Sequence, residues 1–148
     1  MTLDASCPAC QRVQAALSGR EPWLVAALPH SVLILGDHQA YPGYAVLFSR
    51  HHARELHDLD EAAFAGFTQD LRRAGRAVET ATGCWKLNLA SLGNVVPHLH
   101  VHLFPRAAAD ARRLEHPWAN ADRFQEVGPP EEREAWRLRL RGALEASA

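Results

Sequence analysis

Three histidines stand at every second position of one short stretch: His98, His100 and His102 alternate with apolar residues. Strict alternation is typical of a half-buried strand, in which these three imidazoles share one face. Neighbours along that face lie about 6.6 Å apart, so one polyphosphate could touch more than one ring. Neutral imidazole is a competent nucleophile at neutral pH. We therefore favour a functional face over a histidine-rich solvent face or a purely structural metal site.

The residues just before this stretch suit an attack on phosphorus. Such an attack needs a nucleophile in line with the leaving oxygen and donors around the other oxygens. Backbone N–H groups near Gly93 and Asn94, together with amide side chains, could hold the phosphate oxygens. The alternative is that Asn88 and Asn94 are turn residues that satisfy their own backbone. A second histidine of the stretch would supply a proton or a hydrogen bond.

Two of the three cysteines form a Cys-x-x-Cys motif, Cys7 and Cys10, near the N-terminus. An odd number of cysteines argues against a disulfide framework and favours metal binding or reduced thiols. A redox role would require a thioredoxin-like strand before the motif, and only six residues precede it. Zinc is the better prediction if two further ligands exist.

The apolar pattern predicts the elements that position these residues. A long helix is expected from a cap at Asp60 to a stop at Gly83, because apolar residues recur at three- and four-residue spacing. A short helix is expected at 7–19 and another at 131–146. Strands are predicted at 23–28, 31–35, 44–48 and 84–90, followed by the histidine strand at 94–105, which gives an antiparallel meander.

Length and composition limit the class of protein. A chain of 148 residues predicts a single domain, 1–148, in which 107–148 is a C-terminal extension that packs on or beside the site. Its first part, 107–130, is polar and proline-punctuated, which suggests either a lid or packing around the site. We expect Arg106, just before it, to be a solvated strand end.

With 16 basic and 17 acidic residues, no electrostatic nucleic-acid surface is indicated. No apolar run approaches the length of about 18 residues that a membrane span needs. The N-terminus also lacks a basic region followed by an apolar core, so we expect a cytoplasmic protein.

The segment His98 to Phe104 resembles the signature of the histidine triad family, and the likeness extends from about Cys7 to Arg106. The resemblance implies an α+β fold with a five-stranded antiparallel sheet, one long helix and short terminal helices, usually paired into a homodimer. It also implies nucleotidyl transfer or hydrolysis at the α-phosphate of a small-molecule nucleotide conjugate.

The resemblance also assigns roles to residues. His100 would be the nucleophile, His102 would hydrogen-bond the phosphate or leaving group, and His98 would orient the site. Phosphate would be held by Asn88, Gly93 and Asn94, and the ribose hydroxyls by Asp37. A zinc site made by Cys7, Cys10, His52 and His98 is implied, with His51 competing with His52. Val95 stands where many members carry Ser or Thr on the phosphate.

Our first hypothesis is an enzyme that hydrolyses dinucleoside polyphosphates through a nucleotidyl-His100 intermediate. Hydrolysis of adenosine phosphoramidates is the alternative within the same chemistry, because only the leaving group differs. A non-catalytic nucleotide-sensing protein and a small zinc-stabilised structural domain are alternatives from other classes.

Overall fold

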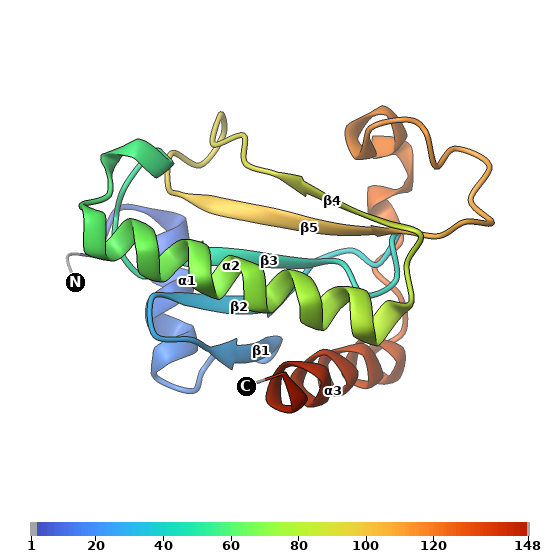
Figure 1. Cartoon of the computed structure of the whole chain (residues 1–148), viewed down its shortest axis with the longest axis horizontal. Helices are drawn as coiled ribbons and strands as arrows, with labels where there is room; N and C mark the ends of the chain where they lie inside the picture. Colours follow the sequence, from blue (N-terminus) through green and yellow to red (C-terminus); the bar gives the residue numbers. More distant parts are fainter. Residues whose placement is uncertain (1–2, 148) are drawn as a thin grey trace.

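Five antiparallel strands form one sheet in the computed structural model, which describes residues 3–147 (Figure 1). The order across the sheet is β1-β2-β3-β5-β4, and every neighbouring pair is antiparallel. The strands are β1 (Leu24–Ala27), β2 (Ser31–Leu35), β3 (Ala45–Ser49), β4 (Lys86–Ala90) and β5 (His100–Arg106). The helices are α1 (Pro8–Leu17), α2 (Glu61–Thr82) and α3 (Pro130–Ala146), with short 3-10 helices η1 (Leu56–Asp58) and η2 (Pro117–Gln125). The predicted α+β fold is confirmed.

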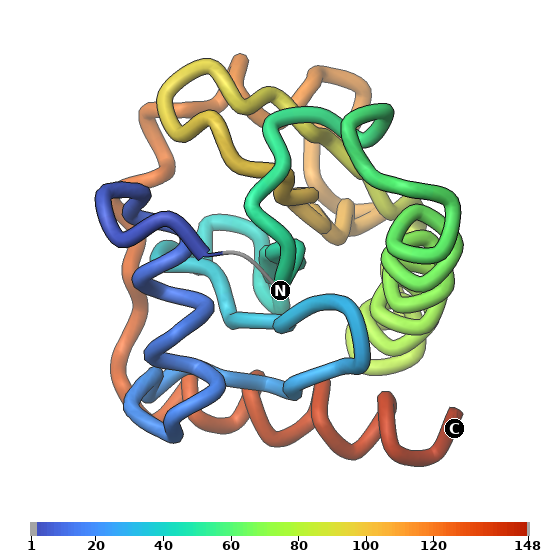
Figure 2. The backbone as a smooth tube through the Cα atoms, turned by 90° about the vertical axis from the view of Figure 1, so that its left-hand side faces the viewer, coloured from blue at the N-terminus to red at the C-terminus, as the bar shows by residue number. Residues whose placement is uncertain are grey.

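Each face of the sheet has its own hydrophobic cluster, because the strands are apolar on both sides. Helix α2 covers one face and α1 lies on the other, as Figure 2 shows. The α2 face includes Leu33, Leu47 and Leu103, and the α1 face includes Ile34, Val46 and Phe104. Since side chains alternate along a strand, His100 and His102 of β5 lie on the same face as Phe104, which is the α1 face.

Helix α2 has the two ends that the sequence predicts. The Asp60 side chain accepts a hydrogen bond from the backbone N–H of Ala63 at 2.8 Å, which satisfies one free donor of the first turn. Gly83 ends the helix with φ of 60°, a left-handed conformation that glycine adopts without steric cost. Within residues 3–147, no helix is both long and apolar enough to cross a membrane.

Helix α3 protects one edge of the sheet. Arg137 and Arg141 donate hydrogen bonds to the backbone carbonyls of Leu24 and Val25 on β1, at 3.2 and 2.9 Å. These arginines occupy carbonyls at an edge strand, which would otherwise be open to another chain. Leu140 of α3 is fully buried in the cluster on the α2 face.

The histidine strand is shorter than predicted. It begins at His100, so that His98 precedes it in an irregular segment. Pro97 has no N–H to offer to a ladder, which limits how far the strand can extend toward the N-terminus. Leu99 still bridges two segments, because its carbonyl accepts from the N–H of Ser49 and its N–H donates to the carbonyl of Ala53.

A buried carboxylate joins α2 to the β1–β2 turn. Asp70 accepts hydrogen bonds from the His30 N–H and the Ser31 hydroxyl, both at 2.8 Å. We expect Asp70→Ala to lower the free energy of unfolding by about 2 kcal/mol, because two donors lose their partner. Chemical denaturation measures this change. Glu79→Ala, an exposed change on the same helix, is the control, and equal stability of the two variants would contradict the assignment.

Candidate active site

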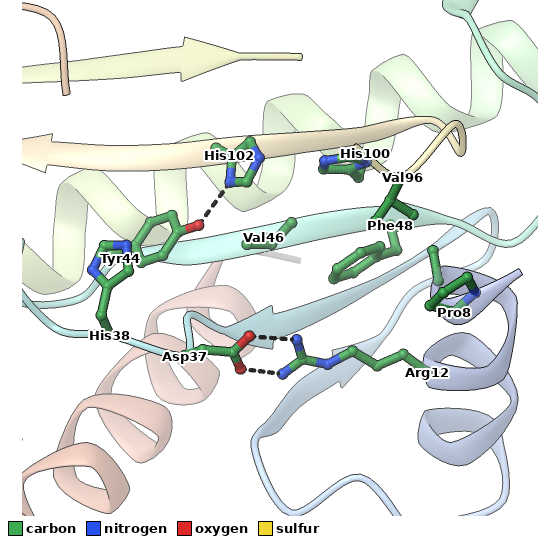
Figure 3. A pocket seen from close by; sticks show the side chains of 11 residues that line it. Pro8, Arg12, Asp37, His38, Tyr44, Val46, Phe48, Val96, His100 and His102 are labelled. Carbon is green, nitrogen blue, oxygen red and sulfur yellow. Dashed lines mark hydrogen bonds and ion pairs between the residues drawn. The ribbon is translucent and has the colours of Figure 1, made fainter. Parts of the chain in front are cut away.

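A cavity of about 280 Å³ opens on the α1 face of the sheet (Figure 3). It brings together three of the predicted site residues: His100 and His102 from β5, and Asp37 from the loop after β2. Of the other predicted residues, His98, Asn88, Gly93 and Asn94 do not line it. The lining is completed by Pro8, Ala9, Arg12, His38, Tyr44, Val46, Phe48 and Val96.

His100 is oriented by the backbone of the triad itself. Its Nδ1 lies 2.6 Å from the carbonyl oxygen of His98. A carbonyl oxygen only accepts, so Nδ1 carries the proton and Nε2 keeps its lone pair. The ring also stacks on Phe48 at 5.6 Å and is mostly buried. The free nitrogen therefore belongs to a ring that lines the cavity in a fixed orientation.

His102 sits two residues further along the same face, in an aromatic environment. Its Nδ1 lies 2.7 Å from the hydroxyl oxygen of Tyr44, and the Trp118 ring meets it edge-on at 5.2 Å. Burial lowers the pKa of His102 to about 4, and the neighbouring His100 and His38 add to that effect. The ring is therefore neutral at neutral pH.

An ion pair forms the far wall of the cavity. Arg12 of α1 donates two hydrogen bonds to the carboxylate of Asp37, at 2.8 and 3.1 Å, and a third to Glu21 at 3.1 Å. Burial disfavours the charge of Arg12, but the two carboxylates outweigh it and raise the pKa of the guanidinium. The Asp37 side chain is 76% exposed, so its remaining lone pairs are open to a ligand.

The family resemblance pointed to Asp37, which lines the cavity, whereas Arg12 was not predicted. Residues 12 and 37 belong to different elements, and only the placement of α1 beside the end of β2 brings them together. No local spacing in the sequence carries that information.

The predicted phosphate-binding residues lie outside the cavity lining. Asn88 on β4 pairs with Phe104 on β5, and its Oδ1 accepts a hydrogen bond from Arg106 at 3.0 Å. Gly93 has φ of 67°, which suits the turn between the two strands. From that loop, Val96 reaches the cavity lining.

The expectation that Arg106 is a solvated strand end was wrong, because the residue is fully buried. Its guanidinium donates to the backbone carbonyls of Glu115 and Arg112, at 2.5 and 2.8 Å, and lies over the Tyr41 ring at 5.0 Å. The segment after β5 folds back over the strand end, so that two of its backbone carbonyls lie within hydrogen-bonding distance of the Arg106 guanidinium.

The four predicted metal ligands meet beside the triad. Their donor atoms, from Cys7, Cys10, His52 and His98, lie within 4.8 Å of one another. His98 Nδ1 is 3.4 Å from the Cys10 sulfur and 3.7 Å from the Cys7 sulfur, and His52 Nδ1 is 3.2 Å from the Cys10 sulfur. Two thiolates and two imidazoles form a tetrahedral metal-binding set. The cluster contains His52 and not His51.

A second interaction prepares His98 as a ligand. Its Nε2 lies 2.9 Å from the carbonyl oxygen of Ser49, so this nitrogen carries the proton and Nδ1 is left with a lone pair. Such outer partners fix the tautomer of metal-binding histidines. Burial lowers the pKa of His98, which favours the neutral ring that a metal requires.

We expect Cys10→Ser to lower the affinity for a divalent metal ion at least tenfold and to lower the melting temperature of the metal-loaded protein, because one of four ligands is weakened. Metal content after dialysis and thermal unfolding with and without chelator measure both effects. Cys84→Ser is the control, since Cys84 lies outside the cluster. Equal metal content in the Cys10 variant and wild type would contradict the assignment.

The pKa of His102 predicts a pH dependence of stability. An unfolded histidine titrates at about 6.5, so between pH 6.5 and 4 the unfolded chain binds a proton that folded His102 does not. The free energy of unfolding should therefore fall as pH is lowered through this window. We expect His102→Asn to show a shallower decrease in denaturation curves. A decrease as steep as that of wild type would show that His102 is not held neutral.

Comparisons with known proteins agree with this geometry. A family model for the HIT domain matches residues 22–109. A histidine triad protein from Bradyrhizobium japonicum has a similar solved structure, with 31% identity and a TM-score of 0.74, over 86% of this chain and 94% of that chain. No curated protein sequence matches the chain.

Two further solved structures share the fold. One is a histidine triad protein from Sinorhizobium meliloti, at 24% identity and a TM-score of 0.74, covering 94% of this chain and 93% of that chain. The other is a zinc-bound histidine triad family protein from Mycobacterium smegmatis, at 23% identity and a TM-score of 0.65, covering 95% and 94%. Because the family model spans more than half of its residues, this chain belongs to the histidine triad family.

Proposed function

We propose that the protein hydrolyses nucleotide conjugates, with dinucleoside polyphosphates as the substrate class, through a covalent nucleotidyl-His100 intermediate. The observation that carries the proposal is the 2.6 Å contact between His100 Nδ1 and the His98 carbonyl. It commits one nitrogen to the backbone and leaves Nε2 as a nucleophile in the cavity lining.

The reaction would have two steps at the α-phosphorus. In the first, the Nε2 lone pair of His100 forms a bond to phosphorus, and the bond to the bridging oxygen breaks with its electron pair on the leaving nucleotide. In the second, a water oxygen attacks the same phosphorus, the P–N bond electrons return to Nε2, and the attacking water releases a proton to the bulk solvent. Holding the ring in one orientation lowers the entropic cost of the first step.

The remaining lining suits a nucleoside. Asp37 offers carboxylate lone pairs to ribose hydroxyls, while Val46 and Phe48 offer an apolar surface to a base. Arg12 adds a positive charge to a cavity that would receive an anionic substrate.

The phosphate would also need donors from outside the cavity lining. The backbone around Gly93 and Asn94 would supply N–H groups to phosphate oxygens. Asn88 would contribute only its amide N–H groups, because its oxygen already accepts from Arg106.

Zinc is the metal that the four-donor cluster would take, since two thiolates and two imidazoles are typical of closed structural zinc sites. The zinc-bound relative from Mycobacterium smegmatis supports this proposal. A bound ion would cross-link the start of α1 to the segment before β5. It would leave His98 unable to relay protons, so that His100 and His102 would carry the chemistry.

We also propose a homodimer formed at the β4 edge of the sheet. Among the strands of residues 3–147, β4 pairs with β5 alone, and Trp85 and Leu89 beside that edge are 53% and 51% exposed. Exposed apolar residues at an unpaired strand edge favour association with another chain.

We expect His100→Ala to reduce kcat for a diadenosine polyphosphate by more than about 10⁴-fold, because the nucleophile is lost. Thermal unfolding should change little, and binding of a non-hydrolysable diadenosine analogue should persist. Steady-state kinetics and calorimetry measure these quantities.

The control is His57→Ala, which removes a histidine whose side chain is 83% exposed and does not line the cavity. Turnover by the His100 variant at the wild-type rate would refute the proposal. Nucleotide binding by wild-type protein without turnover of any conjugate would instead identify a nucleotide-sensing protein.

A further inference from the structure

Tyr44 is held on the α1 face by close aromatic packing. Its ring stacks on Phe104 at 4.3 Å with an interplanar angle of 3°, and on His38 at 4.6 Å and 19°. On another side lies Gly36, where a Cβ atom would come within 2.0 Å of the tyrosine ring. The absence of a side chain at residue 36 therefore makes room for this ring. Tyr44 has little freedom to move, and its hydroxyl has a fixed position.

That hydroxyl meets His102 and determines where its proton lies. The Tyr44 oxygen is 2.7 Å from His102 Nδ1, and it has no other hydrogen-bond partner within residues 3–147. A phenol is protonated at neutral pH, and burial raises the pKa of Tyr44 further. Since Nδ1 is the one partner of this hydroxyl within residues 3–147, an Nδ1–H tautomer would leave the hydroxyl proton unpaired, and we assign the hydroxyl as the donor to Nδ1. The only proton of neutral His102 is then on Nε2.

We propose that Tyr44 is a positioning residue that holds His102 as a neutral imidazole with its proton on Nε2, and that the site consequently selects phosphoanhydrides over phosphoramidates. The proposal rests on the hydrolase function proposed above and names the leaving-group class of its substrate. His102 would act as a hydrogen-bond donor to an oxygen and not as an acid.

The two leaving groups differ in their need for a proton. When a phosphoanhydride is cleaved, the electron pair of the P–O bond stays on a nucleoside phosphate oxygen, which is stable as an anion because its pKa is about 6. When a phosphoramidate is cleaved, the electron pair of the P–N bond stays on an amine nitrogen, which must receive a proton. A neutral imidazole can stabilise the oxygen anion by a hydrogen bond, but it has no acidic proton to give to the nitrogen.

The surroundings of His102 support the neutral form. The titratable groups that face it are His100 on the same strand, and Tyr44 and His38 from the β2–β3 connection. Burial and the two histidines oppose a positive charge, and a pKa of about 4 leaves only about one ring in a thousand protonated at pH 7. The residues packed on its other sides, Phe104 and Trp118, carry no charge.

The test is Tyr44→Phe, which keeps the stacked ring and removes only the hydroxyl. Nitrogen-15 NMR of the histidine side chains reports the tautomer directly. We expect wild-type His102 to carry its proton on Nε2, and the variant to show a mixture with the Nδ1–H form. The pKa of His102 should rise in the variant, because nothing then competes with a proton at Nδ1.

Kinetics on matched substrates test the leaving-group preference. We expect wild type to have a higher kcat/KM for a diadenosine polyphosphate than for an adenosine phosphoramidate, and Tyr44→Phe to reduce that ratio at least tenfold with little change in KM. Tyr41→Phe is the matched control. Tyr41 is another buried tyrosine of this cluster, and its hydroxyl bonds the Pro117 carbonyl and not a histidine.

Three outcomes would overturn the inference. These are an Nδ1–H tautomer of His102 in wild type, an unchanged tautomer and substrate ratio in Tyr44→Phe, and a wild-type preference for phosphoramidates. If wild type cleaves neither substrate, the hydrolase function and the leaving-group preference both fail. The NMR tautomer would still decide whether Tyr44 positions His102.

Discussion

The placement of His98 is the constraint on which the rest of the site depends. Its imidazole is fixed at both nitrogens, with Nε2 on the Ser49 carbonyl and Nδ1 among the two cysteine sulfurs. Its own carbonyl in turn accepts the Nδ1 proton of His100. The orientation of the His100 ring is thus set by a backbone group, and that group is anchored by a buried side chain. If His100 is the nucleophile, as we propose, it reaches its substrate with little conformational freedom to lose.

The histidines that alternate in residues 98–102 differ in their hydrogen-bond partners. Burial holds the pKa values of His98 and His102 below the ordinary value, and the hydrogen-bond partners of His100 and His102 differ. The His98 carbonyl accepts a hydrogen bond from Nδ1 of His100. The Tyr44 hydroxyl, in our assignment, donates one to the lone pair on Nδ1 of His102. As we propose, the same residue type thereby becomes a nucleophile at one position and a hydrogen-bond donor at the other.

Local sequence patterns were enough to predict the long helix, the five strands and the Cys-x-x-Cys part of the candidate metal-binding cluster, whereas His52 and His98 followed from the family resemblance. Asp60 and Gly83 mark the ends of α2 because capping acts within a few residues, and the Cys-x-x-Cys spacing is itself a ligand signature. The strand pattern gave the correct face for His100 and His102. It extended β5 too far, since a period of two does not reveal where hydrogen bonding to the neighbouring strand begins.

The residues that sequence reasoning missed act over long separations. Arg12 reaches Asp37, and Tyr44 reaches His102 across 58 positions, only because the sheet and α1 bring them together. The burial of Arg106 was not foreseen for the same reason. The carbonyls to which it donates, those of Arg112 and Glu115, belong to a segment whose sequence has no regular pattern. Propensity and periodicity carry no information on such pairs.

In the reaction that we propose, His100 Nε2 forms a covalent bond to the α-phosphorus. The most direct measurement is rapid mixing of wild-type protein with a diadenosine polyphosphate, an alkaline quench that preserves the P–N bond, and mass spectrometry of the digested chain. Our account predicts a nucleotidyl group on the peptide that contains His100, with His100 as the modified residue. A nucleotidyl group on another residue, or turnover without any covalent adduct, would contradict it.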